Sequence, residues 1–374
     1  MTAGTGHRRA AEALAEAVRL QDAQAEVVCL DLLAWVPAWL RWAYPKVYQC
    51  LVGFLPTLWA VGYYALDHPW VFRAVQRCRG LWNRTVTRRL IRWVGQWQPD
   101  VVIATHFFPA EVFGYERQAG RLAARVIVVI TDLFPHRLWL TAGADAIVVG
   151  SDKTKQLCQA RGIDAQRLHV LGIPIGSQFC VPQDRSALAR QWNLDPGRRT
   201  VLIVSGGMGL GPVAKLVHRL VDVEHARPGR LQLLVVCGEN ARLARRLRTC
   251  YADSAMPVQV FEFVETMPEL MAASDLLVTK AGGLTVMEAL AMGVPMVLCG
   301  VIPGQERFNA EYVVRHGAGI LTGSPGDAVE AAIRILDDPQ AYARMRSSAM
   351  SVGRPQAADE IVERFVCGRL DGDS

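Results

Sequence analysis

The chain of 374 residues lacks several features that would point to particular protein classes. None of its nine cysteines forms a C-x-x-C pair, so we expect reduced core cysteines in a cytosolic protein, without a disulfide framework or a metal site. The N-terminus has no apolar segment of the kind that opens a secretory signal. Disorder is also excluded, because 51% of the residues are hydrophobic and only 20% are charged.

Acidic residues are absent between Asp67 and Asp100, where seven arginines accumulate. Eight of the ten tryptophans lie in the same third of the chain. A basic surface favours an anionic partner, either nucleic acid or phospholipid, and tryptophan beside arginine is typical of a membrane interface. We therefore expect an anionic membrane surface and no nucleic acid as a partner. A tryptophan-rich core beneath a solvated basic helix would have the same composition.

Residues 47–66 carry no charge over a length that could span a bilayer. Pro56 and Gln49 interrupt this segment. A span would also place residues 1–34 and 100–150 on opposite sides of the membrane, although they look like one domain. We therefore expect a buried or interfacial segment, in a protein attached peripherally to the cytoplasmic face of the plasma (inner) membrane.

The length predicts two domains, since a domain averages about 150 residues. Short apolar runs alternate with helix-like segments, which is typical of parallel strands buried on both faces in a doubly wound α/β fold. The first series of expected strands is 26–33, 100–105, 124–131, 145–150 and 168–173. The second series is 199–207, 231–238, 258–264, 275–283 and 294–300.

These series predict two Rossmann-like domains that face each other across a cleft. The first domain is expected over residues 1–175, with a tryptophan- and arginine-rich insertion at 35–97 that α/β alternation does not explain. The second is expected over residues 176–374, with its last helix packing back on the first domain.

Two glycine-rich turns follow predicted strands of the second domain. SGGMGLGP at 205–212 and TKAGGLTVMEALAMGVP at 279–295 each join a strand to a helix. Backbone N–H groups at such helix starts bind phosphate, and two of them at one sheet edge suit a diphosphate. Glu288, three residues after Thr285, lies one turn inside the second helix, where a carboxylate could bind a ribose diol. An ordinary surface glutamate fits the same spacing.

The sequence opens with a third turn of this kind, TAGTGH at 2–7, but only Met1 precedes it. Such a turn normally follows a buried strand, so we expect the first strand of the N-terminal domain to be missing from the chain as written. His7 comes at the start of a helix, whose dipole disfavours imidazolium. A neutral imidazole there is a candidate general base, and a packing or capping histidine is the alternative.

The order and spacing of several segments resemble one protein family. GTGHRRAAEAL, PDVVIATHFFPAEV and VITDLFPHRLWLTAGADAIVVGSDKTKQLCQARGI lie in the first half, and CGEN, KAGGLTVMEALAMGVPMVL and IPGQERFNAEYVVRHGAG in the second. They resemble the family 28 glycosyltransferases, and most of all the monogalactosyldiacylglycerol synthases and processive diacylglycerol glucosyltransferases. The resemblance implies a GT-B fold and an inverting, metal-independent transfer of a hexose from a UDP-sugar to diacylglycerol, without a cofactor.

The resemblance also implies site residues. The backbone at Phe263 and Val264 would hold the uracil, with Met267 against it, and Glu288 would bind the ribose. Gly206, Gly207, Gly282 and Gly283 would surround the diphosphate, Gln305 and Glu306 would bind sugar hydroxyls with Asn309 nearby, and Gly238, Asn240, Lys280 and Thr285 would complete the nucleotide site.

On the acceptor side, His7 is the implied base, and Asp132 and His106 are further catalytic candidates at strand ends. The positions expected to shape the acceptor site are Gly4, Gly6, His136 and Trp139. Three alternatives remain: an N-acetylglucosamine transferase acting on another lipid-linked acceptor, an enzyme of the UDP-sugar 2-epimerase type, and an inactive nucleotide-sugar-binding homologue.

Overall fold

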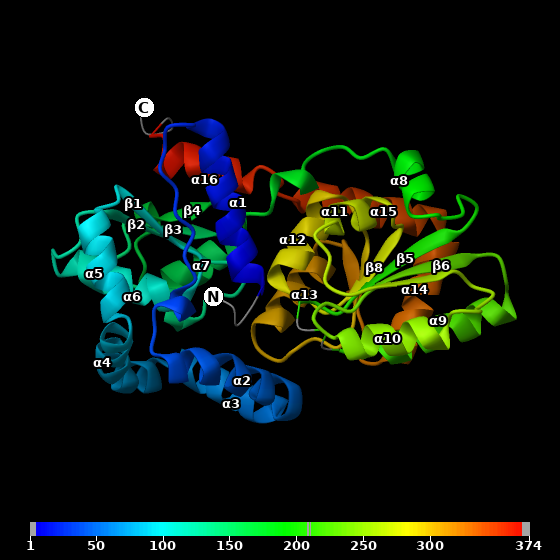
Figure 1. Ribbon diagram of the computed structural model, residues 1–374, viewed down its shortest axis with the longest axis horizontal. Coiled ribbons are helices and arrows are strands. Elements are labelled where there is room, and N and C mark those ends of the chain that lie inside the picture. Colours follow the sequence, from blue (N-terminus) through cyan, green and yellow to red (C-terminus); the bar gives the residue numbers. More distant parts are fainter. Residues whose placement is uncertain (1–4, 208, 210, 369–374) are drawn as a thin grey trace. The chain divides into compact units, whose positions relative to one another are not determined.

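The computed structural model describes residues 5–207, 209 and 211–368 (Figure 1). The chain divides into two compact units, which are described separately. Unit 1 comprises Met1–Ser177, Pro303–Gln305 and Gln356–Ser374, and unit 2 comprises Gln178–Ile302 and Glu306–Pro355. Each unit contains one sheet of parallel strands with helices packed on it, so the predicted α/β class is confirmed.

The sheet of unit 1 has four parallel strands in the order β1-β2-β3-β4. Its central strands are runs of apolar residues that are buried on both faces, as a parallel sheet covered by helices requires. The strands are β1 (Val101–Ala104), β2 (Arg125–Val129), β3 (Ala146–Val149) and β4 (Leu168–Val170), each slightly shorter than its prediction. Between them come α6 (Phe107–Gln118) and α7 (Asp152–Ala160).

Two helices from opposite ends of the sequence cover this sheet together. In Figure 1, α1 (Thr5–Gln21, blue) lies beside α16 (Ala357–Phe365, red). Leu14 of α1 and Ile361 of α16 share one buried apolar cluster with Val129 and Val148 of the sheet. The last helix is therefore part of the core of unit 1.

The strand expected at residues 26–33 is wrong. Residues 25–31 are neither helix nor strand, and Leu32–Ala34 form a short 3-10 helix, η1. A strand is stable only when a neighbour accepts and donates its backbone hydrogen bonds. Among the described residues no strand pairs with this segment, and Val28 and Leu30 remain 41% and 38% exposed.

The insertion is helical throughout. It consists of α2 (Ala38–Phe54), α3 (Pro56–Asp67), α4 (Pro69–Val86) and α5 (Arg88–Trp97). Pro56 and Pro69 begin α3 and α4, where a proline costs no hydrogen bond. Within the described residues no single helix is long and apolar enough to cross a bilayer, although α2 and α3 together meet that test as a pair bent by 113°.

The tryptophans of the insertion do not form a core. None of the eight is buried, and Trp39, Trp42, Trp70 and Trp82 are 50–72% exposed. The alternative of a tryptophan-rich core beneath a basic helix is therefore wrong.

Unit 2 has a six-stranded parallel sheet in the order β10-β9-β8-β5-β6-β7. Numbered from β5, this is the doubly wound order 3-2-1-4-5-6, which reverses between β5 and β8. The strands are β5 (Arg199–Val204), β6 (Leu231–Val236), β7 (Val258–Phe261), β8 (Leu276–Thr279), β9 (Met296–Leu298) and β10 (Gly319–Leu321), of which only β10 was not predicted.

The helices of unit 2 follow its strands. Those that share one buried cluster with the sheet are α9 (Val213–Ala226), α10 (Ala241–Cys250) and α14 (Pro325–Asp337). The others are α8 (Arg185–Gln191), α11 (Met267–Ala272), α12 (Gly283–Ala291), α13 (Gln305–Arg315) and α15 (Pro339–Val352), of which α12 and α15 pack together.

The packing of α16 predicts that its core residues stabilise unit 1. Ile361 is 0% exposed, so Ile361→Ala should lower the free energy of unfolding by about 2–5 kcal/mol through lost burial and a cavity. Leu20→Ala, at a position 71% exposed on α1, should change it by less than about 0.5 kcal/mol. Urea denaturation followed by fluorescence measures both, and equal effects would contradict the packing.

Candidate functional site

His7 lies in the first turn of α1 and contacts the ends of two strands. Its Nδ1 is 3.1 Å from the carbonyl oxygen of Thr105, directly after β1, and 2.6 Å from the hydroxyl oxygen of Thr131, two residues after β2. The Thr105 hydroxyl in turn donates to the carbonyl oxygen of His7 at 2.8 Å. The start of α1 is thereby fixed to the edge of the sheet where the parallel strands end.

These contacts select one tautomer of the His7 ring. A carbonyl oxygen only accepts hydrogen bonds, so Nδ1 must carry the proton of the neutral imidazole when it pairs with Thr105. The Thr131 hydroxyl is a second acceptor, and its own hydrogen points toward the Thr105 carbonyl, 3.5 Å away. Nε2 then keeps its lone pair, and it has no hydrogen-bond partner among the described residues. A lone pair held in this way can take a proton from a substrate hydroxyl.

Burial keeps the His7 ring neutral. It lowers the pKa of His7 from 6.5 to about 4, because the ring is densely surrounded although part of the residue stays accessible. His106 meets it edge-on with the ring centroids 4.7 Å apart. Burial, and then the proximity of His7, hold the pKa of His106 well below its usual value. Near neutral pH both rings are therefore uncharged.

His106 and His136 use their ring nitrogens to hold the backbone. Nδ1 of His106 accepts from the N–H of Phe108 at 3.1 Å and caps α6. Nδ1 of His136 accepts from the N–H two residues on at 3.1 Å, and its Nε2 donates to the carbonyl oxygen of Tyr63 at 2.9 Å. A neutral imidazole has one nitrogen lone pair, and in both residues that pair is occupied. The geometry therefore favours His7 over His106 as the base.

Trp139 and Asp132 lie close to these histidines. The buried ring of Trp139 has its centroid 5.9 Å from that of His7 and 6.2 Å from that of His106. Asp132 follows Thr131 after β2, and its charge, after burial, raises the pKa of Tyr63. The structure thus places His106 and Trp139 against His7. Asp132 and His136 both lie near Tyr63 in the same unit.

Gly4 and Gly6, just before His7, are the two glycines expected to shape the acceptor site. Gly4 lies outside the described residues. Gly6 is in the first turn of α1, and a Cβ added there would meet no described atom within 4 Å. Space therefore does not require glycine at this position.

In unit 2 the predicted glycine turns flank the reversal of strand order. Gly206 and Gly207 follow β5, and Gly282 and Gly283 join β8 to α12. Ligands of doubly wound sheets bind at this point, beyond the carboxyl ends of the strands. No side chain caps α12, so its first N–H groups remain available to an anion.

The turns after β5 and β6 pack backbone against backbone. Gly206 and Gly238 have φ values of +71° and +58°, which favour glycine. A Cβ at Gly238 would collide with the carbonyl oxygens of Gly206 and Gly207, and the N–H of Glu239 donates to the Gly207 carbonyl at 2.9 Å. The two turns therefore form one rigid surface.

Lys280 and Glu306 form an ion pair beside this surface. A Cβ added to Gly206 would lie 2.8 Å from Cε of Lys280, so the lysine runs alongside the β5 turn. The second carboxylate oxygen of Glu306 accepts from the N–H of Ile302 at 3.0 Å. Both oxygens of this predicted sugar ligand are thus engaged within the chain.

Asn240 and Asn309 shape the neighbouring loops. Asn240 caps α10 by accepting from the N–H of Leu243 at 3.0 Å. The amide of Asn309, 0% exposed, donates to the carbonyl oxygen of Ala281 at 3.0 Å and ties the β8 turn to α13. Both residues thus support loops beside the glycine turns.

Glu288 is only 4% exposed, so the alternative of a surface glutamate is wrong. Thr285 on the same helix is half-buried. Phe263 and Val264 follow β7 at one end of the sheet, and Met267 begins α11. Gln305 has a buried side-chain oxygen without a hydrogen-bond partner among the described residues. Among all the residues that the structure describes, no three His, Cys, Asp or Glu side chains are arranged to hold a metal ion.

Comparison with known proteins identifies the family. The family model for monogalactosyldiacylglycerol synthase matches residues 7–175, and that for the glycosyltransferase family 28 C-terminal domain matches residues 200–361. A processive diacylglycerol beta-glucosyltransferase of Bacillus subtilis is 31% identical over 74% of this chain and 71% of its own. The chain belongs to the monogalactosyldiacylglycerol synthase family of glycosyltransferases. It is therefore a UDP-sugar-dependent glycosyltransferase, and the epimerase alternative is set aside.

Other relatives agree in sequence and in fold. A probable chloroplastic monogalactosyldiacylglycerol synthase 2 of Oryza sativa subsp. japonica is 29% identical to this glycosyltransferase over 96% of its chain and 77% of the relative. The crystal structure of MurG from Acinetobacter baumannii matches 76% of this chain and 78% of its own with a TM-score of 0.57 and 20% identity. A UDP-GlcNAc 2-epimerase from Neisseria meningitidis matches 75% and 80% with a TM-score of 0.59 and 16% identity. These structures confirm the GT-B fold class.

The sequence analysis missed the two threonines that orient His7. Thr105 and Thr131 each end a strand segment and each precede a predicted site residue, His106 or Asp132. This repeated threonine at the ends of neighbouring parallel strands is the pattern that could have identified them. The glycosyltransferase thus orients the candidate base His7 through residues that follow two neighbouring strands.

The burial of His7 predicts an unusual titration. Its ring resonances should titrate near pH 4 in the folded glycosyltransferase instead of near 6.5, with His7→Gln providing the assignment. The unfolded chain binds a proton at this residue near pH 6.5, and the folded chain binds it only near pH 4. The free energy of unfolding should therefore fall as pH drops through this window, and His7→Gln should reduce that fall. Titration near pH 6.5 would contradict the buried neutral ring.

The contact between the β5 and β6 turns predicts a second effect. Gly238→Ala should destabilise unit 2 by about 1–3 kcal/mol and weaken UDP binding in calorimetry, since the new Cβ meets two carbonyl oxygens. Gly229 is the matched control, because it also has positive φ, at +90°, but a Cβ there meets nothing within 4 Å. Gly229→Ala should leave UDP binding unchanged, and equal loss of binding in both variants would refute the contact.

Proposed function

We propose that this glycosyltransferase moves a hexose from a UDP-sugar to diacylglycerol, with inversion at the anomeric carbon. The relatives named above include enzymes that by name act on diacylglycerol. The observation that carries the proposal for this chain is the neutral His7, whose Nδ1 is held by Thr105 and Thr131 while Nε2 keeps its lone pair. Such a base suits an alcohol acceptor, which needs to lose a proton as it attacks.

The proposed donor site lies at the reversal of strand order in unit 2. The diphosphate would bind to the N–H groups at the start of α12 and to the β5 turn at Gly206 and Gly207, with Lys280 as a nearby cation. Glu288 would bind the ribose, and the backbone at Phe263 and Val264 the uracil. The unpaired buried oxygen of Gln305 is a suitable acceptor for a sugar hydroxyl.

In the proposed reaction the acceptor hydroxyl oxygen attacks the anomeric carbon and its proton passes to Nε2 of His7. The bond between that carbon and the phosphate oxygen breaks, and UDP leaves with the electron pair. Attack from the opposite face inverts the anomeric centre. We propose that the start of α12 and Lys280 stabilise the charge on the leaving diphosphate without a metal ion. Asp132 and Trp139 would orient the acceptor beside His7.

Membrane attachment is the second part of the proposal. More than half of the exposed large apolar side chains of the described residues lie on α2, α3 and α4, and they include Trp39, Trp42, Phe54 and Trp70. Exposed apolar side chains gathered on neighbouring helices mark an interaction surface, whereas single scattered ones do not. Tryptophan side chains favour the depth of the lipid headgroups in a membrane. We propose that these helices hold the enzyme on the cytoplasmic face of the inner membrane, where diacylglycerol is available.

Transfer of label from UDP-sugars to diacylglycerol in vesicles tests the proposal. UDP-glucose, UDP-galactose and UDP-N-acetylglucosamine are compared as donors, and one of the hexoses should give labelled glycolipid. His7→Ala should lower kcat by roughly 10²–10⁴-fold, the usual contribution of a general base, with UDP affinity unchanged. The exposed His225 on α9 is the matched control, and His225→Ala should leave kcat unchanged.

Several results would overturn the proposal. A full rate in His7→Ala would exclude His7 as the base, and loss of transfer in EDTA would exclude the metal-independent step. Transfer only to a polyprenyl-linked acceptor would favour the other lipid-linked alternative. No product from any donor, with UDP still bound, would indicate an inactive homologue.

A further inference from the structure

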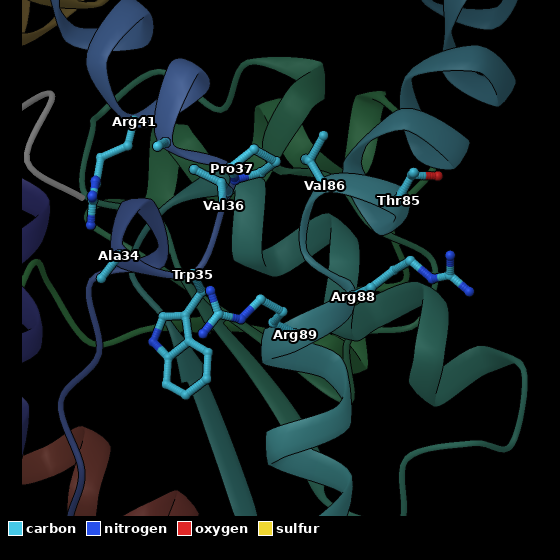
Figure 2. Close-up of a pocket in the computed structure, with 10 residues that line it drawn as sticks. Ala34, Trp35, Val36, Pro37, Arg41, Thr85, Val86, Arg88 and Arg89 are labelled. Atoms are coloured by element: carbon cyan, nitrogen blue, oxygen red, sulfur yellow. The ribbon is translucent and has the colours of Figure 1, made fainter.

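A cavity of about 250 Å³ lies in the insertion, where the start of α2 meets the junction of α4 and α5 (Figure 2). Arg41, Arg88 and Arg89 line it together with Trp35. None of its lining residues is acidic. It is therefore an open, strongly basic hollow outside the donor and acceptor residues described above.

The arginines of the insertion fall into two groups. Arg79 and Arg84 on α4 form ion pairs with Glu111 and Glu116 of α6, at 3.0 and 2.7 Å, and so fasten the insertion to the sheet domain. Those at the cavity differ, because no carboxylate of the described residues lies within 4.0 Å of the guanidinium groups of Arg41, Arg88 or Arg89. Uncompensated positive charge around a hollow is the arrangement that an anion site requires.

The start of one helix adds to the positive potential of the cavity. Its lining includes Pro37 and Ala38 at the start of α2 and Arg88 and Arg89 at the start of α5. Neither helix has a side-chain cap, and the hydroxyl of Thr87 donates instead to the carbonyl oxygen of Asn83 at 2.7 Å. The uncapped N–H groups and the positive dipole end of α2 favour a bound anion. The positive end of α5 is offset by the carboxyl end of α4, whose Thr85 and Val86 also line the cavity.

The side chains of Arg41 and Arg89 extend in a different direction from that of Arg88. In Figure 2, Arg89 extends from α5 toward Trp35 and Arg41 extends from α2 on the same side, whereas the head of Arg88 points away, beside Thr85. The planar guanidinium groups of Arg41 and Arg89 present paired donors that fit the oxygens of a phosphate.

We propose that this cavity binds a phosphate ester anion, through Arg41, Arg89 and the start of α2. Trp39 follows the lining residue Ala38 on α2, and Trp82 comes three residues before the lining residue Thr85 on α4. Their ring centroids are 6.0 Å apart, and both are at least half exposed. Tryptophan rings favour the depth of lipid headgroups in a membrane. When α2 and α4 contact a bilayer, these two rings would therefore bring the cavity to the depth of phospholipid headgroups. The lipid source of the anion rests on the proposed membrane attachment, and the site itself does not depend on the transfer reaction.

Charge-matched variants of the full chain test the site. Binding is measured by flotation with phosphatidylcholine vesicles that contain or lack phosphatidylglycerol, and by the shift in Tm with inorganic phosphate or glycerol 3-phosphate at constant ionic strength. Arg92, on α5 but not lining the cavity, is the control. Arg92→Gln should weaken binding to anionic vesicles about fivefold, as for one surface charge. Arg41→Gln and Arg89→Gln should each weaken it about tenfold more.

The double variant Arg41→Lys/Arg89→Lys distinguishes a specific phosphate site from general attraction to a positively charged surface. It keeps the net charge but loses the paired donors, so a site predicts at least about tenfold weaker binding. Wild-type binding in this variant, or equal losses in Arg89→Gln and Arg92→Gln, would overturn the proposal. A Tm shift with soluble phosphate that Arg89→Gln abolishes supports the site with a free phosphate as ligand. Binding that depends on Arg89 only with anionic vesicles, and not with soluble phosphate, supports the site with a lipid headgroup as its ligand.

Transfer of sugar provides an independent outcome. If flotation depends on Arg41 and Arg89 while no glycolipid forms, the phosphate site stands and the proposed function fails. If glycolipid forms and neither anion assay responds to these arginines, the proposed function stands and the phosphate site fails. Unchanged circular dichroism and Tm without ligand show that each variant is folded.

Discussion

Parallel hydrogen bonding between strands is the constraint on which the rest of this structure depends. Every strand pair in both sheets is parallel, so all strands of a sheet end at the same edge. In unit 1 this brings Thr105 and Thr131 to one place, where they meet His7. In unit 2 it sets the glycine turns after β5 and β8 on both sides of the reversal of strand order. Each candidate site thus follows from strand direction before any side chain is considered.

Sequence could predict the strands and the glycine turns because each depends on a short continuous segment. Runs such as residues 124–131 are too apolar to lie anywhere except in a covered sheet, and positive φ at Gly206 and Gly238 requires glycine. The environment of His7 could not be predicted, because its partners lie 98 and 124 residues away. The tautomer that leaves Nε2 with its lone pair is set only when these distant segments meet.

The same contrast explains the wrong strand and the undecided insertion. Residues 26–33 have a suitable apolar pattern, but a strand also needs a neighbour, which a local pattern does not report. Composition alone could not decide whether the tryptophans of the insertion face a core or solvent. That outcome depends on which helix faces pack on the sheet domain, and a local composition does not report it.

Helix α6 joins the histidines of unit 1 to the insertion. One end of α6 is capped by His106, and along its length Glu111 and Glu116 hold α4 through ion pairs. Along α6, the separation between that histidine and the residues that hold α4 is therefore set by helix rise, at about 1.5 Å per residue, with no loop between them. α6 thus couples the position of the insertion to that of the ring that packs against His7.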